Sequence, residues 1–148
     1  MQPSKYFSIQ EFVPPTIFSM FGKKSWWFID PTIVAIADAL REDLGAPLVC
    51  NNWSTGGTFQ NRGYRTPQST VGARYSQHRL GNAIDLSSLG LTPAQLLQVI
   101  MRNKAKYIAL GLTTIEDLAD TPTWLHLDCR PRIEGVHPPD DFLIVKPA

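Results

Sequence analysis

Apolar residues recur at helical spacing in two parts of the chain, and these parts predict the two main helices. In each, a polar residue that can cap the N-terminus, Asp30 or Thr92, precedes a proline at the first helical position. The first helix is expected to end at Gly45 and the second before Gly111, since glycine commonly follows the last helical residue. The apolar positions are Ile33, Val34, Ile36, Ala37, Leu40 and Leu44 in the first helix, and Leu96, Leu97, Ile100 and Met101 in the second.

Shorter apolar runs, bounded by turn residues, predict strands. We expect one strand at 47–52, two more at 112–116 and 124–130, and a closing strand at 142–146. Together with the helices, these strands predict a single α+β domain over 1–148, in which helices pack on a small antiparallel sheet.

The first thirty residues are expected to be irregular apart from a short helical start at 8–11. Ser8 and Glu11 fit a capping box there, and Pro14-Pro15 should end the segment. An aromatic group follows and is expected to pack against the body of the domain: Phe21, Trp26, Trp27 and Phe28.

Composition narrows the class of protein. The chain has 148 residues, 43% of them hydrophobic, which is enough to bury one ordinary core. Its 14 basic and 13 acidic residues give a net charge of +1, so no overall field draws it to nucleic acid or to an anionic membrane. No apolar run approaches the about 18 residues that span a bilayer, and no signal-peptide stretch is present. We therefore expect a soluble protein made in the cytoplasm, with Cys50 and Cys129 as buried free thiols.

Charge is distributed unevenly along the chain. Between Asp43 and Asp85 there is no acid, whereas from Glu116 to Asp141 seven acids face only two arginines. The acid-free segment contains four arginines: Arg62, Arg65, Arg74 and Arg79. One segment could hold an anionic substrate and the other could hold a metal or supply a base, although both could equally be solvated faces.

Two of the three histidines lie in segments that could bind a metal. Gly81 and Asn82 allow the chain to turn after His78, so that Asp85, on a short strand that follows, can fold back toward it. In the strand at 124–130, alternation places His126 on the face opposite the leucines. Two imidazoles and one carboxylate would give zinc three protein ligands and leave the fourth position open for water, as in catalytic sites.

Four motifs follow one another along the chain. They are Tyr6-Phe7-Ser8-Ile9-Gln10-Glu11-Phe12, Gly63-Tyr64-Arg65, Ser76-x-His78-x-x-Gly81-x-Ala83-x-Asp85 and Trp124-x-His126-x-Asp128. Together they resemble the zinc D-alanyl-D-alanine carboxypeptidase and L-alanyl-D-glutamate endopeptidase family, which shares its fold with the hedgehog signalling domain. The resemblance covers most of the chain and implies a hedgehog/DD-peptidase-like fold with zinc bound by His78, Asp85 and His126.

The resemblance also implies a substrate. Members of this family hydrolyse short peptides that contain D-amino acids in bacterial peptidoglycan, and the first motif is similar to that of phage and bacterial members. By the same match, Arg65 and Ser76 would contact the substrate, and the forked donors of arginine suit a carboxylate. Arg65 could instead form a surface ion pair, and Ser76 could cap a loop.

The sequence departs from the family pattern next to the last metal ligand. Many relatives carry His-x-His or Glu-x-x-His there, whereas this chain has Trp124 and Thr123, and neither can take a proton from water. If the strand at 112–116 pairs antiparallel with the strand at 124–130, Glu116 lies diagonally within reach of His126 and could act as general base.

Three alternatives to Glu116 remain open at this point. Asp128 lies on the same strand face as His126, and it could be the base or a partner that orients His126. His137 is a further candidate, and the chain could also have no competent base.

We expect a zinc-dependent peptidase that acts on peptidoglycan stem peptides at the bacterial cell wall. Without an export signal, it would be a phage lysis protein released through a separate pore, or a virion component that meets the wall. The alternative from another class is a non-catalytic wall-binding or virion structural module that retains the metal. A nucleic-acid-binding role would rest on the four arginines alone, and we do not expect one. The sequence does not predict the oligomeric state.

Overall fold

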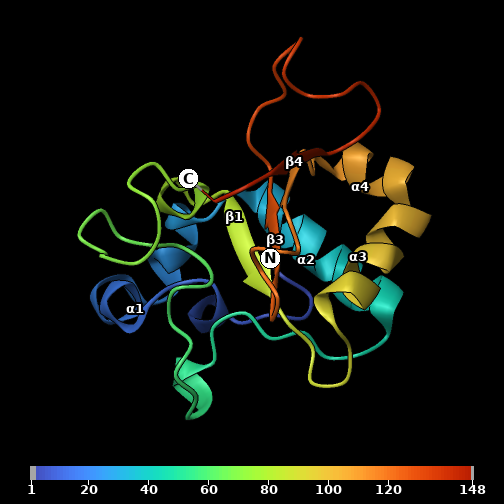
Figure 1. Ribbon diagram of the computed structural model, residues 1–148. Coiled ribbons are helices and arrows are strands. Elements are labelled where there is room, and N and C mark those ends of the chain that lie inside the picture. The colour runs from blue at the N-terminus through green and yellow to red at the C-terminus, as the bar shows by residue number, and fades with distance from the viewer. Residues whose placement is uncertain (1–2, 148) are drawn as a thin grey trace.

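The computed structural model describes residues 3–147, which form a small mixed sheet with four α-helices around it (Figure 1). The helices are α1 (Pro15–Phe21), α2 (Pro31–Leu44), α3 (Pro93–Arg102) and α4 (Lys104–Leu110). The strands are β1 (Ala83–Leu86), β2 (Thr114–Glu116), β3 (Leu125–Asp128) and β4 (Leu143–Val145), in the spatial order β1-β3-β2-β4. Short 3-10 helices cover η1 (Ile9–Glu11), η2 (Gly22–Phe28), η3 (Trp53–Thr55) and η4 (Gln77–Leu80).

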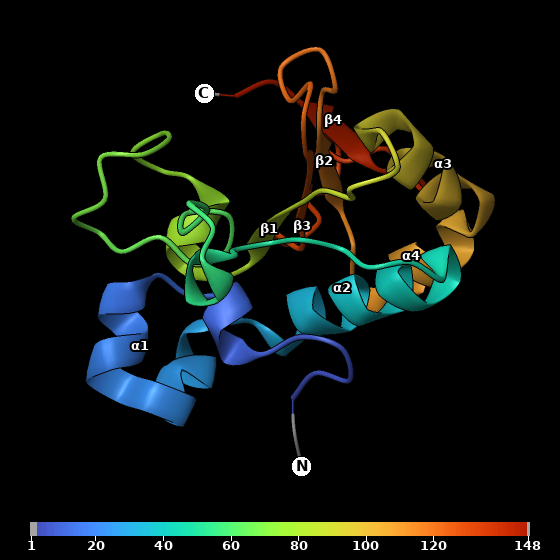
Figure 2. The ribbon, with the colours of Figure 1, turned by 90° about the horizontal axis from the view of Figure 1, so that it is seen from below.

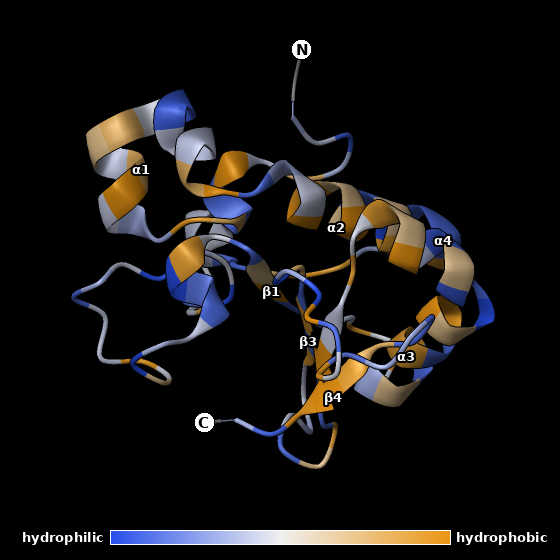
Figure 3. Ribbon diagram, turned by 90° about the horizontal axis from the view of Figure 1, so that it is seen from above, coloured by the Kyte–Doolittle hydropathy of each residue, from blue (hydrophilic) through white to orange (hydrophobic). Residues whose placement is uncertain are grey.

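Three of the four α-helices lie on one side of the sheet. In Figures 1 and 2, α2, α3 and α4 lie on one side of the strands and α1 lies on the other. Figure 3 shows hydrophobic residues concentrated in the strands and on parts of α2 and α3. Leu125 and Leu127 of β3 are fully buried in the same core as Ile36 and Leu40 of α2. Because side chains alternate along a strand, the other two residues of β3, His126 and Asp128, lie on the opposite face of the sheet.

The predicted helix caps are confirmed. The Asp30 side chain accepts a hydrogen bond from the backbone N–H of Thr32 at 2.8 Å, and Gly45 ends α2 in the left-handed region at φ 66°. Thr92 forms a capping box with Gln95 at the start of α3. The second predicted helix is interrupted, however, because Asn103 adopts a non-helical conformation and its side chain donates to the carbonyl of Val99. It therefore forms two helices, α3 and α4.

The prediction of a purely antiparallel sheet was wrong for one strand pair. β3 pairs antiparallel with β1 and with β2, but β4 pairs parallel with β2. The connection from β3 to β4, residues 129–142, is long enough to carry the chain past β2 and into the sheet again from the same end. Three of the predicted strands are thus present, with shorter bounds, and the strand expected to contain Asp85 is β1.

The strand predicted at 47–52 is absent apart from a single bridge between Val49 and Ser87. The backbone N–H of Asn51 donates instead to the carbonyl of Glu11, and that of Asn52 donates to the carbonyl of Phe59. The segment therefore bonds to three separate parts of the chain, at Glu11, Phe59 and Ser87, and does not form a regular hydrogen-bond ladder with any one strand.

The N-terminal segment differs in part from its prediction. The capping box of Ser8 and Glu11 is present, but the chain continues into α1, which has Pro15 at its first position. Of the aromatic group, three residues pack against the core, whereas Trp27 is 74% exposed. Both cysteines are free thiols; Cys50 is buried and Cys129 is partly buried. Within residues 3–147, every helix is too short or too polar to cross a membrane.

Candidate metal centre

His78 and Asp85 are brought together by a tight turn between η4 and β1. Ser76 caps η4 by accepting a hydrogen bond from the backbone N–H of His78 at 3.3 Å. Gly81 ends η4 with φ 74°, and a Cβ at this position would collide with the carbonyl oxygen of Phe28. Glycine is therefore required here both for conformation and for space, and the turn returns Asp85 toward His78 as the sequence predicted.

His126 reaches the same point from the neighbouring strand. In the antiparallel pairing of β1 with β3, Asp85 lies directly opposite His126. Directly opposed residues have their side chains on the same face, about 5 Å apart at Cβ. The register of two strands thus completes a group whose third member comes from η4.

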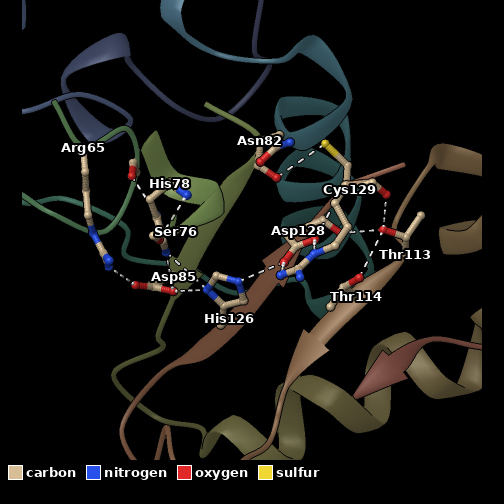
Figure 4. A network of polar contacts seen from close by, with 12 residues as sticks. Arg65, Ser76, His78, Asn82, Asp85, Thr113, Thr114, His126, Asp128 and Cys129 are labelled. Carbon is tan, nitrogen blue, oxygen red and sulfur yellow. Dashed lines mark hydrogen bonds and ion pairs between the residues drawn. The ribbon is translucent and has the colours of Figure 1, made fainter. Parts of the chain in front are cut away.

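The three side chains converge on one another in the interior (Figure 4). Nδ1 of His126 lies 2.8 Å from Oδ1 of Asp85, and Nε2 of His78 lies 3.2 Å from both of these atoms. All three residues are buried, and their ligand atoms lie within 4.8 Å of one another. This buried group, which includes every residue predicted as a metal ligand, could hold a metal ion.

Each of the two imidazoles also forms a hydrogen bond through the ring nitrogen that faces away from this point. Nδ1 of His78 donates to the carbonyl oxygen of Gly63 at 2.8 Å, which leaves Nε2 as the free acceptor. Nε2 of His126 donates to Oδ2 of Asp128 at 3.2 Å. Contacts of this kind fix the orientation and tautomer of metal-binding imidazoles.

The electrostatics of the group favour positive charge at its centre. Burial lowers the pKa of His78. Burial also lowers the pKa of His126, but the carboxylates of Asp128 and Asp85 outweigh it and raise that pKa to about 9. Burial raises the pKa of Asp85, and the two imidazoles more than offset this, so the pKa lies well below its usual range. A cation at this centre would displace the proton of His126, because metal ligands bind in their deprotonated form.

Asp128 is fully buried behind His126. Both of its carboxylate oxygens accept hydrogen bonds from Arg130: Nε donates to Oδ1 at 2.8 Å and Nη2 donates to Oδ2. Burial raises the pKa of Asp128, while Arg130 and His126 lower it by a larger amount. The carboxylate lies outside the cavity wall, in the position of a partner that orients His126.

A cavity of about 560 Å³ opens onto this candidate metal-binding group. His78, Asp85 and His126 contribute to its wall, together with segments from the loop at 71–77 and from the end of β4. A buried donor group at the inner end of an open cavity is the arrangement that admits both a metal and a substrate.

Glu116 lies in the wall of this cavity. The pairing of β2 with β3 places Thr114 opposite Asp128 and Ile115 opposite Leu127, so the next residue, Glu116, comes opposite His126. The sequence predicts a diagonal position for Glu116 relative to His126, whereas the observed register places Glu116 directly across from His126. Burial raises the pKa of the Glu116 carboxyl above its usual value. Glu116 is therefore near the candidate metal-binding group without belonging to it.

The two residues expected to contact substrate, Arg65 and Ser76, also lie in the cavity wall. Nη2 of Arg65 donates to Oδ2 of Asp85 at 3.1 Å, so part of the guanidinium is already paired. Ser76 caps η4, which was the alternative role considered for it.

His137, a further candidate for the base, lies outside this cavity. It is buried between β2 and the loop before β4, where Nδ1 accepts from the backbone N–H of Ile133 at 3.0 Å and Nε2 lies 3.3 Å from Oγ1 of Thr114. These contacts attach the loop to the sheet.

Some residues of the site were not identified from the sequence. Arg130, which holds Asp128, continues the alternation of 124, 126 and 128 on β3, and that pattern could have identified it. Lys146 and Asp120 also line the cavity, but only the folding of distant segments brings them there.

No protein-family model matches the chain, and no curated protein or solved structure matches it either. The assignment of function therefore depends on the geometry of the site and on the motifs in its sequence.

Proposed function

We propose that the protein is a zinc-dependent peptidase with a hedgehog/DD-peptidase-like fold, which hydrolyses an amide bond in peptidoglycan stem peptides. The bond would be of the type cut by D-alanyl-D-alanine carboxypeptidases or by the related endopeptidases. The observation that supports this most is the convergence of Nε2 of His78, Oδ1 of Asp85 and Nδ1 of His126 at the inner end of an open cavity.

The donor set fits zinc. Two imidazole nitrogens and one carboxylate oxygen are three ligands of the kinds that zinc prefers, and three protein ligands are typical of catalytic zinc sites. A zinc ion held there would supply Lewis acidity, which makes a water molecule acidic near neutral pH and polarises an amide carbonyl. The same donors also suit Fe(II), so metal analysis of the purified protein is part of the test.

Glu116 is the residue we assign as general base. Its carboxylate would accept a proton from the attacking water as the water oxygen bonds to the carbonyl carbon. The same proton would then pass to the amide nitrogen as the C–N bond breaks, which restores the carboxylate. The position of Glu116 in the cavity wall, opposite His126, and its raised pKa support this role over that of Asp128, which is buried behind His126.

Arg65 and Ser76 are the residues we assign to substrate binding, with Arg65 beside the anionic part of the peptide. Nη2 of Arg65 is paired with Asp85, but Gly72 has no side chain to cover Nη1. That nitrogen can therefore donate to a carboxylate in the cavity. A substrate of this kind places the site of action at the bacterial cell wall, in a phage lysis protein or a virion component.

The experiment is incubation of the zinc-loaded protein with purified peptidoglycan, followed by measurement of new amino termini and free D-alanine. We expect release by the native protein and none by His126→Ala. The matched control is His137→Gln, which removes a histidine outside the cavity and should keep both zinc and activity. If the fully loaded native protein releases nothing while it still binds peptidoglycan, the enzyme proposal is wrong and a non-catalytic wall-binding module is supported.

A further inference from the structure

The two carboxylate oxygens of Asp85 have different partners. Oδ1 faces the imidazoles of His78 and His126 at 3.2 and 2.8 Å, whereas Oδ2 accepts a hydrogen bond from Nη2 of Arg65 at 3.1 Å (Figure 4). Both side chains of this ion pair are largely buried, with 6% of Asp85 and 12% of Arg65 exposed. Burial of a charged pair limits competition from water, so the division between the two oxygens is maintained.

The guanidinium of Arg65 is fixed by contacts with the backbone. Its Nε donates to the carbonyl oxygen of Asn61 at 2.6 Å, and its own backbone N–H donates to the carbonyl of His78 at 3.1 Å. On its other side, a Cβ at Gly72 would collide with Nη1. The arginine is therefore held in one orientation, and Nη2 is directed at Oδ2 of Asp85.

We infer that Arg65 is a positioning residue that keeps Asp85 a one-oxygen ligand. This inference rests on the proposed function, because it requires that His78, Asp85 and His126 bind a metal ion. With Oδ2 held by Arg65, Asp85 offers only Oδ1 to the ion, and the number of protein donors is limited to three.

The limit matters because a carboxylate can bind a metal through one oxygen or through both. A second oxygen from Asp85 would add a donor beside the position that a catalytic zinc site keeps for water or substrate, and the ion would then have five donors in place of four. Arg65 would thus act on the reaction through Asp85, in addition to any contact of Nη1 with substrate.

The test uses Co²⁺ in place of zinc, since the visible absorption of Co²⁺ reports its coordination number. Four-coordinate Co²⁺ gives intense bands, and these weaken when a fifth donor binds. Two variants remove the contact in different ways: Arg65→Met deletes the guanidinium, and Gly72→Ala displaces it through the collision with Nη1. Thermal unfolding shows whether each variant is folded. If Arg65→Met is unfolded, Gly72→Ala decides the test.

Each variant has a matched control. Arg62→Met deletes a half-buried arginine that bonds Ser87 and does not line the cavity. Gly56→Ala places a side chain at another exposed glycine with positive φ, 93°, where a Cβ meets no atom within 4 Å. We expect loss of band intensity in Arg65→Met and Gly72→Ala, and native spectra in both controls.

The outcomes separate this inference from the proposed function. If the native protein binds neither zinc nor Co²⁺, the metal site itself is wrong. If the native protein binds Co²⁺ and the folded variants keep its spectrum, Arg65 does not control Asp85 and the inference is overturned. Folded variants that no longer bind Co²⁺ at all would also overturn it, because Arg65 would then be needed to form the site.

Discussion

Nδ1 of His126 lies 2.8 Å from Oδ1 of Asp85, although 41 positions separate the two residues in the chain. Their contact follows from the register of β1 against β3, which sets them directly opposite each other. A shift of one residue in this register would turn His126 to the leucine side of the sheet and remove it from the site. Correct strand pairing is therefore a condition for the chemistry we propose.

Replacement of Glu116 by glutamine is expected to remove activity and leave zinc bound, because Glu116 lies beside the metal-binding group and contributes no donor to it. Loss of a general base should lower kcat by about 10²- to 10⁴-fold. The measurement is peptide hydrolysis together with zinc content. Glu134→Gln, which changes an exposed glutamate that does not line this cavity, is the control. Full activity in Glu116→Gln would assign the role to another group.

The pH dependence of the native enzyme tests the same residue. Burial raises the pKa of Glu116, and the carboxyl must be ionised to accept a proton. Activity should therefore fall as the pH decreases and this carboxyl becomes protonated, and the residual activity of Glu116→Gln should lack this acid limb. The same acid limb in Glu116→Gln would contradict the role of Glu116.

Asp128→Asn is expected to weaken zinc binding, since the carboxylate accepts from Nε2 of His126 and holds its imidazole in place. Replacement of such a partner typically costs about 10- to 100-fold in metal affinity or activity. Competition with a chelator measures the affinity. The result that would contradict this role is native zinc affinity with greatly reduced kcat, because it would make Asp128 the base.

The metal-free protein should lose stability as the pH rises from about 6.5 to about 9. The pKa of His126 is raised from 6.5 to about 9 in the folded state, so the folded state binds this proton more tightly than the unfolded state does. The contribution of His126 to the free energy of unfolding is complete below the unfolded-state pKa, and it is lost as the pH rises through the folded-state pKa. Thermal unfolding against pH checks this, with His126→Asn as comparison. If the unfolding temperature fell equally with pH in both proteins, His126 would not be the group responsible.

Arg79 is expected to hold the loop that forms one wall of the cavity. Its guanidinium donates to four backbone carbonyl groups at 2.7 to 3.2 Å. Each such bond stabilises the loop by about 1 kcal/mol, so Arg79→Met should speed chymotrypsin cleavage after the exposed Tyr75 by at least about tenfold. Arg74→Met, which changes an arginine of the same loop that makes none of these bonds, should cleave at the native rate. Equal rates in both variants would show that Arg79 does not order the loop.

Local patterns in the sequence were sufficient for the caps of α2 and α3, for β2, β3 and β4, and for the short strand that contains Asp85. They failed where contacts between distant segments decide the structure. The 47–52 segment has strand-like composition, but its backbone hydrogen bonds go to Glu11, Phe59 and Ser87, which lie in three separate segments. The parallel pairing of β4 depends on the path of residues 129–142, for which the local sequence has no pattern.

The candidate metal-binding group was predicted from turn residues and strand alternation together with the resemblance of its motifs to a zinc-peptidase family. The turn at Gly81 and the alternation around His126 were both visible in the sequence. The pairing of Asp85 with Arg65 was not visible, because it depends on side-chain packing between segments that are 20 residues apart. The contact of Arg130 with Asp128 joins residues two positions apart and follows the alternation that could have identified it.

The most direct test of the account is anomalous X-ray diffraction from crystals of the zinc-loaded protein, measured on both sides of the zinc absorption edge. We expect one strong peak, bound by Nε2 of His78, Oδ1 of Asp85 and Nδ1 of His126, with a non-protein ligand completing the coordination. Absence of zinc at this position, or a fourth protein side chain bound to it, would contradict the proposed catalytic metal centre.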